Sequence, residues 1–148
     1  NAPPMIEAGL KSLRWLMEIQ TTPDGLFRPV GTESFGKRRQ QPSTFDQQPV
    51  EAAAAISACI AACRVSSDPA WSVAAMRAFN WYLGDNDLRT PLVDHDTGSC
   101  RDGLHADRPN ENRGAESVVS YLLGLVEIRQ LLSDAAIGSA DSALALIA

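Results

Sequence analysis

The hydrophobic positions of the chain fall into four helical stretches separated by two long polar loops. Over residues 5–20 and 70–83, apolar side chains recur at helical spacing and leave one polar face on each stretch. Residues 50–65 and 114–132 are apolar almost all round, which predicts inner helices that are surrounded by protein. A last short helix is predicted at residues 139–147.

Residues that start and stop helices lie at the ends of these stretches. The turn-forming residues 22–25 end the first helix, and Pro49 fits the first helical position of the second. Asp68 and Pro69 are predicted to be the N-cap and first residue of the third helix. Gly84 is predicted to be the C-cap of that helix. The polar segments that remain, before Pro49 and after Gly84, are therefore loops.

One short pattern occurs twice in the chain. Residues 46–52 (DQQPVEA) return 65 positions later as residues 111–117 (ENRGAES), each time at the start of an apolar helix. Trp15 and Trp81 are 66 positions apart and repeat with them. A repeated unit of this kind implies stacked helical hairpins. It also gives the glutamate of each copy an equivalent position in the architecture.

Outer helices alternate with inner helices in this order, and both long loops lie at one end of the predicted stack. The chain is therefore predicted to be all-α, a partial α/α toroid that forms one domain over residues 1–148. A plain up-and-down bundle is the alternative. Bundles favour connections of about 2–8 residues, whereas both long loops here exceed 20 residues. We expect an excised C-terminal portion of a longer protein, with residues 1–2 as a cloning remnant.

Charge and cysteine usage narrow the classes of partner and compartment. A net charge of −5 argues against nucleic acid or an anionic membrane surface as partner. The longest apolar run, residues 52–63, is too short to span a bilayer. Cys59 and Cys63 lie four positions apart on an apolar helix, which indicates buried thiols in a reducing, cytoplasmic compartment.

The second long loop contains the densest polar stretch, residues 94–105, but it does not have the spacing of a metal site. Asp94 and Asp96 lack the glycine and the glutamate that complete a calcium-binding EF-hand loop. His95 and His105 have no zinc-binding context, and Cys100 has no CxxC companion. We therefore expect Asx turns and loop salt bridges here, and neither a metal nor a cofactor.

The repeated glutamates, Glu51 and Glu116, have two interpretations. Each stands three residues after a predicted N-cap, where a glutamate can bond back to the helix end and complement its dipole. Alternatively, both point into the mouth of the toroid as a carboxylate pair that binds sugar hydroxyls or serves as acid and base. A cap needs only one residue of each copy, whereas acids and amides precede both glutamates. Both interpretations stay open.

The candidate site residues share a place in the long loops or at the start of an inner helix. The substrate-binding candidates are Asp46, Gln47, Glu51, Arg101, Asp102, His105, Asn110, Asn112 and Glu116. The catalytic candidates among them are Glu51, Asp102 and Glu116.

Aromatic and basic residues give further expectations. Helical tryptophans usually fill the space between helices, so Trp15, Trp71 and Trp81 are predicted to pack in the core. Loop phenylalanines are better placed to stack on a sugar ring; they are Phe27, Phe35 and Phe45. The basic cluster at residues 37–39 belongs to a solvated loop or captures an anion.

Four strings of the sequence resemble the helical C-terminal region of bacterial family 4 glycosyltransferases of the group 1, GT-B type. The strings are residues 45–51 (FDQQPVE), 81–88 (WYLGDNDL), 100–105 (CRDGLH) and 110–117 (NENRGAES). The resemblance covers residues 5–132 and implies a helical tail related in layout to α/α toroids. It assigns no catalytic residues.

This resemblance implies an accessory domain that binds or positions a glycan or sugar acceptor. Its partner would be the N-terminal transferase domain of the same polypeptide, which holds the nucleotide-sugar site. A toroid-type carbohydrate-active enzyme, similar to glycoside hydrolases or epimerases and using the paired carboxylates, is one alternative. The other is a purely structural module that packs on the transferase or forms a homodimer.

Overall fold

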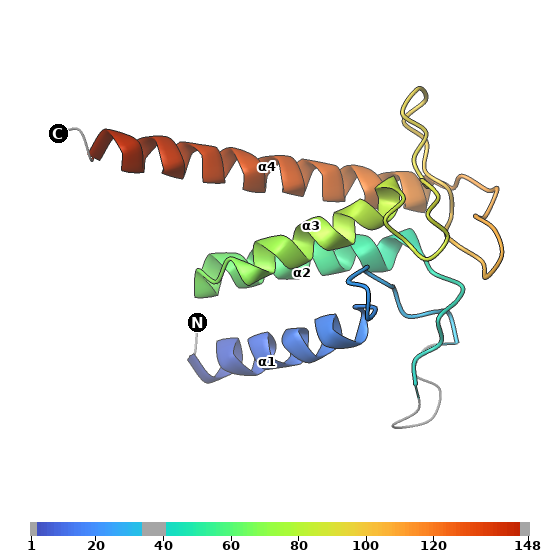
Figure 1. The fold of residues 1–148 in the computed structure, drawn as a ribbon, viewed down its shortest axis with the longest axis horizontal. Coiled ribbons are helices and arrows are strands. Elements are labelled where there is room, and N and C mark those ends of the chain that lie inside the picture. The colour runs from blue at the N-terminus through green and yellow to red at the C-terminus, as the bar shows by residue number, and fades with distance from the viewer. Residues whose placement is uncertain (1–2, 34–40, 146–148) are drawn as a thin grey trace.

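The computed structural model describes residues 3–33 and 41–145, with side chains described as far as residue 136. It contains four helices, α1 (Pro3–Ile19), α2 (Pro49–Ser66), α3 (Ala70–Leu83) and α4 (Ala115–Ala145) (Figure 1). Extended backbone in the described ranges is limited to isolated bridges, and none of it forms a strand. The predicted all-α class is therefore confirmed for this part of the chain.

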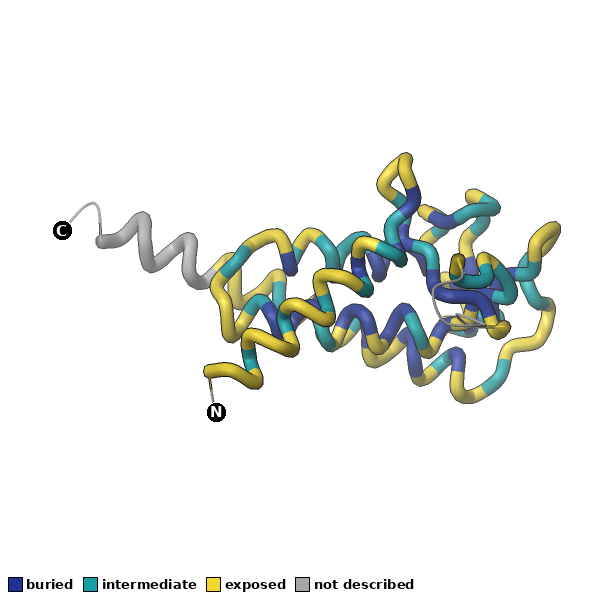
Figure 2. Tube along the Cα trace, turned by 90° about the horizontal axis from the view of Figure 1, so that it is seen from below, coloured by how far each residue is buried: buried dark blue, intermediate teal, exposed yellow. Residues whose placement is uncertain are grey.

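Helix α2 is the centre of the packing. It makes its most extensive contacts with α3 and α4, and a smaller contact with α1. Both long loops lie at one end of the molecule, next to the first turns of α2 and α4, as the sequence predicted (Figure 1). Buried positions are concentrated where these loops meet the helix ends, whereas the beginning of α1 is exposed (Figure 2).

The predicted helix boundaries agree with the structure except near the C-terminus. Helix α3 spans the predicted residues 70–83, and Gly84 follows it with a left-handed φ of 111°. Pro69 is the N-cap and not the predicted first residue, while the carboxylate of Asp68 accepts the amide of Ala70 at 3.0 Å. The separate short helix predicted at residues 139–147 is wrong, because α4 continues without a break to Ala145. No proline interrupts this alanine-rich segment, and helix propensity alone favours its continuation. Residues 146 and 147 lie outside the described ranges.

The two inner helices share several buried positions of the repeated unit, although Ala53, Ile60 and Ala62 are buried where the equivalent residues of α4 are only half-buried. At an offset of 65 residues, the buried pairs are Ala52 with Ser117, Ala55 with Ser120, Ile56 with Tyr121, and Cys59 with Gly124. The exposed pairs are Ala54 with Val119, Ser57 with Leu122, and Ala61 with Val126. The duplicated sequence pattern is therefore matched by a duplicated packing pattern.

The core lies between α2, α3 and α4. Tyr82 is fully buried and its hydroxyl donates to the backbone oxygen of Pro49 at 2.6 Å. The rings of Phe79 and Tyr121 are stacked, with centroids 6.1 Å apart. A Cβ on Gly124 would lie 2.9 Å from Cδ1 of Ile56, so α2 and α4 approach closely where this glycine stands. Small residues thus set the spacing of the two inner helices.

Two packing predictions fail at the edges of the molecule. Trp71 and Trp81 are buried as predicted, but Trp15 is 54% exposed, because α1 contacts its neighbours through one face only. Helix α2 is not surrounded on all sides either, since Val50 and Val65 are exposed together with Ala54 and Ala61. A helix is buried on every side only when other elements surround it, and the hydrophobic pattern of the sequence does not give the number of those neighbours.

Helix α2 is long and apolar enough to cross a membrane when judged by length and composition, and 39% of it is buried within the protein. The sequence prediction of no span considered only the shorter run at residues 52–63. A core helix passes the same test, so this property does not distinguish a span from a packed helix.

A pair of backbone hydrogen bonds fastens the two long loops to each other. The amide of Gln47 donates to the oxygen of Leu104 at 2.9 Å, and the amide of Leu104 donates to the oxygen of Gln47 at 3.0 Å. The residue before Leu104 is Gly103, with φ of 141°, and a Cβ there would lie 2.0 Å from the backbone oxygen of Gln47. Only glycine allows this approach.

We expect Gly103→Ala to lower the free energy of unfolding by about 3 kcal/mol or more, because it combines a strained dihedral with a backbone clash. Gly98→Ala is the matched control, since Gly98 also has a positive φ but nothing lies within 4 Å of its Cβ position. Its cost should be about 1 kcal/mol. Urea unfolding of both variants measures the difference, and equal costs would contradict the loop contact.

Candidate functional site

The side chain of Gln47 is fully buried at the loop end, and both of its polar atoms are partnered. Its Oε1 accepts a hydrogen bond from Nε1 of Trp81 at 2.8 Å. Its Nε2 donates to the backbone oxygen of Thr44 at 3.0 Å and to Oδ2 of Asp87 at 2.6 Å. This residue therefore joins the first loop to α3 and to the segment that follows α3.

Arg28 extends the network from the other side of Asp87. The guanidinium donates from Nε to both oxygens of the Asp87 carboxylate, at 3.0 and 2.9 Å, and from a terminal nitrogen as well. The hydrogen bonds to Asp87 raise the pKa of Arg28. Sequence reasoning missed this pair, because 59 residues separate its members and neither one belongs to the repeated pattern.

Asp102 caps helix α4 from a distance. Its Oδ1 accepts hydrogen bonds from the amide of Gly114 and from Oγ of Ser117, both at 2.6 Å. The carboxylate therefore satisfies donors of the first turn and lies against the positive end of the helix dipole. Beside it, the amide of Asp102 donates to the oxygen of Asn112 at 2.9 Å. Asn112 itself is exposed.

The remaining loop candidates make polar contacts with one another or with nearby loop residues. His105 Nδ1 lies 2.9 Å from Oδ1 of Asp46, which links the two loops beside the Gln47 contact. Arg101 lies 2.6 Å from the carboxylate of Glu111. The side chain of Asn110 accepts the amide of Asn112 at 3.0 Å and forms a local turn.

The predicted loop salt bridges and Asx turns are present around Asp94. Its carboxylate accepts the amides of Asp96 and Thr97, and it pairs with Arg113 at 3.1 Å. The hydrogen bond from Arg113 lowers the pKa of Asp94. Within the described ranges, no three His, Cys, Asp or Glu side chains gather in a way that could hold a metal ion.

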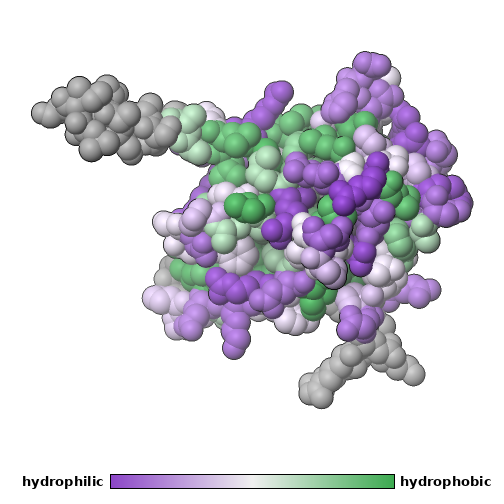
Figure 3. Space-filling model, viewed as in Figure 1, coloured by the Kyte–Doolittle hydropathy of each residue, from purple (hydrophilic) through white to green (hydrophobic). Residues whose placement is uncertain are grey.

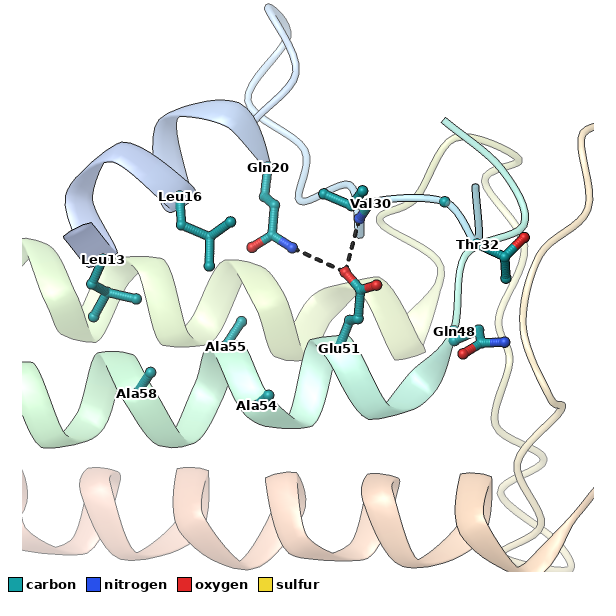
Figure 4. Close-up of a pocket in the computed structure, with 11 residues that line it drawn as sticks. Leu13, Leu16, Gln20, Val30, Thr32, Gln48, Glu51, Ala54, Ala55 and Ala58 are labelled. Atoms are coloured by element: carbon teal, nitrogen blue, oxygen red, sulfur yellow. Dashed lines mark hydrogen bonds between the residues drawn. The ribbon is translucent and has the colours of Figure 1, made fainter. Parts of the chain in front are cut away.

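Glu51 lies in a groove of about 580 Å³ between α1 and α2 (Figure 4). Its Oε2 accepts the backbone amide of Val30 at 2.9 Å and Nε2 of Gln20 at 3.2 Å. The carboxylate therefore binds the loop after α1 and not the start of its own helix. The N-cap, Gln48, makes no side-chain capping bond. Glu51 therefore does not bond back to the start of its own helix, which was one of the two interpretations of the sequence.

Burial is the main influence on Glu51. Loss of solvent raises the pKa of this carboxyl, and the hydrogen bonds from Val30 and Gln20 only partly oppose the change. In the part of the chain that the structure describes, the lining of the groove contains no lysine or arginine that could compensate the charge. A half-buried carboxylate held by neutral donors is a candidate functional group.

Glu116 has different surroundings from its repeat partner. It stands in the first turn of α4, is exposed, and does not line the groove that contains Glu51. The structure therefore brings Asp46, Gln47 and His105 together at the loop end, and Asp102 and Asn112 beside them. It places Glu51 on the α1 side of α2, where Figure 4 shows its carboxylate between Gln20 and Val30.

Two of the three loop phenylalanines pack against the core. Phe27 is 2% exposed and belongs to the core, so it is not free to stack on a ligand. Phe45 is half-buried against the same core. Phe35 and the basic cluster at residues 37–39 lie outside the described residues.

All three cysteines are free thiols. Burial raises the pKa of Cys59 to about 11 and that of Cys100 to about 12. Both therefore stay protonated at neutral pH and pack as small apolar groups. Cys100 is buried although it stands in a polar loop.

Sequence reasoning also missed Gln20, whose side-chain amide donates a hydrogen bond to the carboxylate of Glu51. A signal for it was present, because Gln20 and Asn86 are 66 positions apart, the same offset as the repeated tryptophans. Both amides are buried. The side chain of Asn86 forms hydrogen bonds with backbone groups of Trp81, Leu88 and Thr90 in the turn after α3.

No protein-family model, curated protein or solved structure matches the chain. The family resemblance of the four strings therefore stays a prediction.

We expect Gln47→Ala to lower the free energy of unfolding by about 3 kcal/mol, since it leaves buried donor and acceptor groups of Trp81 and Asp87 without their partner. Asn112→Ala is the matched control, because Asn112 occupies the equivalent repeat position with an exposed side chain. It should change stability by less than about 0.5 kcal/mol. Chemical unfolding measures both, and a Gln47→Ala cost as small as the control's would contradict the network.

The raised pKa of Glu51 predicts a pH-dependent effect of Glu51→Gln. The folded wild type binds more protons than the unfolded chain once the pH exceeds the ordinary carboxyl value of 4.5. Its stability therefore falls with rising pH through the window up to the folded pKa, and this loss is absent from the variant. The stability of the variant relative to wild type should rise across that window.

Unfolding curves at a series of pH values measure this difference. Glu116→Gln corrects for the loss of one unit of charge, because it removes an exposed carboxyl from the equivalent helix. A relative stability of Glu51→Gln that falls with rising pH would contradict the burial argument.

Proposed function

We propose that this chain is an accessory helical domain of a glycosyltransferase that binds or positions a saccharide acceptor at its loop end. The observation that carries the proposal is the convergence of both long loops and both inner-helix starts at one end of the molecule (Figure 1). Loops held by a rigid scaffold are common binding surfaces. No transferase activity is expected of the isolated chain, because the proposed nucleotide-sugar site belongs to a separate domain.

The residues proposed to contact the saccharide are candidates with exposed or half-buried side chains. Acids and amides together supply the acceptors and donors that sugar hydroxyls require. We propose that these contacts come from Asp46, Glu51, Arg101, His105, Asn110, Asn112 and Glu116. Gln47 and Asp102 have a supporting role, because their hydrogen bonds are directed to Trp81 and to the first turn of α4.

A partial α/α toroid is the arrangement that we propose for the four helices. It is supported by the equivalent burial of α2 and α4 and by the position of the long loops. In such a fold, the inner helices begin at the rim where the ligand binds. Glu116 and the exposed end of α2 would then belong to one rim.

A packing module is the second candidate, and one observation favours it. Helix α4 exposes an apolar face formed by Val119, Leu122, Leu123 and Val126. Apolar surface is visible over α4 in Figure 3. Exposed faces of this kind occur at protein interfaces.

Retention on immobilised glycans tests the proposal. We expect wild type to be retained and the Asn112→Ala, Glu116→Gln double variant to bind about tenfold more weakly, since two hydrogen-bonding groups are lost. Both residues are exposed, so the variant should keep its unfolding free energy. Glu7→Gln is the control, because Glu7 is an exposed acid in the first half of α1, away from the loops.

Two results would overturn the proposed function. One is the absence of wild-type binding to any glycan of the panel, which together with concentration-dependent self-association would favour the packing module. The other is binding by the double variant that equals binding by the Glu7→Gln control.

A further inference from the structure

We infer that the groove between α1 and α2 binds a neutral saccharide that carries an apolar chain, with the sugar at Glu51 and the chain between the helices. This inference rests on the proposed function and names the class of acceptor. It uses a part of the molecule that lies beside the loop end, where the surroundings of Glu51 differ from those of its repeat partner Glu116.

The wall of the groove is mostly apolar. Leu13 and Leu16 line it from α1, and three alanines line it from α2 (Figure 4). Alanine leaves space where a larger residue would fill the contact between the helices, and α1 and α2 contact each other only slightly. The resulting volume of about 580 Å³ is in the range of small-molecule sites.

The end of the groove near the loops is polar and rich in acceptors. Gln20 is only 4% exposed, yet its Oε1 accepts no hydrogen bond from the described residues. In Figure 4 this oxygen lies on the side of Leu16, and the amide nitrogen lies toward Glu51. The bonds made by Glu51 use Oε2, which leaves Oε1 for a donor from a ligand. Buried acceptors of this kind are matched by hydroxyl groups.

The charges around the groove select a neutral head group. Among the described residues, no lysine or arginine lines it, and Glu51 would repel a phosphate or a carboxylate. A hydroxylated head group fits the acceptors, and an alkyl chain fits the apolar wall. The two ends of the groove thus match the two parts of a saccharide that is linked to an apolar chain.

Titration calorimetry with matched alkyl glycosides tests the inference. A panel of octyl glycosides, each below its micelle concentration, is compared with the methyl glycoside of the same sugar. We expect the octyl form of the preferred sugar to bind more than about tenfold tighter, which burial of two or more methylene groups would provide. Octyl trimethylammonium serves as a probe with the chain but without the sugar, and it should bind more weakly than the octyl glycoside.

Two variants of α2 test where the octyl chain of the ligand binds. Ala54 lines the groove and Ala61 does not, and both are exposed alanines on α2. Leucine has nearly the helix propensity of alanine, so Ala54→Leu and Ala61→Leu should both fold. Ala54→Leu should abolish the advantage of the octyl chain and leave methyl glycoside binding unchanged. Ala61→Leu should keep the advantage.

The outcomes separate this inference from the proposed function. Equal affinity for octyl and methyl glycosides, or an octyl advantage that survives Ala54→Leu, overturns the inference while glycan retention still supports the proposed function. Octyl trimethylammonium binding as tight as the octyl glycoside overturns the assignment of a neutral sugar. If neither the immobilised glycans nor any alkyl glycoside binds, both proposals fail.

Discussion

The loop end of this protein depends on the buried side chain of Gln47. Its amide accepts from Trp81 and donates to Thr44 and Asp87, while its backbone pairs with Leu104. These partners come from the first loop, from α3 and from the second loop. Because a buried polar group that loses its partner is costly, the network specifies one arrangement of the two loops against α3. Long loops that would otherwise have many conformations are fixed in this way.

The two repeated hairpins have the same scaffold but different chemistry at their helix starts. In the first, Pro49 begins α2 and needs no partner for a backbone amide. In the second, Gly114 takes this place and its amide is bonded by Asp102. The glutamates diverge as well, since Glu51 binds the loop after α1 whereas Glu116 is exposed. The two inner helices therefore share several buried positions, whereas the polar groups at their starts differ.

The sequence predicted the helices well because their signals are local. Periodicity, Pro49 and Gly84 defined α2 and α3 to within one residue. The roles of Gln47 and Asp87 could not be predicted, because their partners are 34 to 59 residues away. The exposure of Trp15 was missed for a similar reason. Its burial depends on how many helices surround α1, and hydrophobic spacing does not contain that number.

The unequal pair of glutamates shows where the chain departs from what folding requires. Position 116 demonstrates that a glutamate at this point of the repeat can remain solvated. Position 51 nevertheless holds a carboxylate that burial penalises and that only neutral donors support. No cationic side chain of residues 3–33 or 41–136 lines the groove to offset this cost. A buried carboxylate that the other copy of the repeat avoids is a departure from what folding alone requires, and it supports the proposal that the groove between α1 and α2 is a binding site.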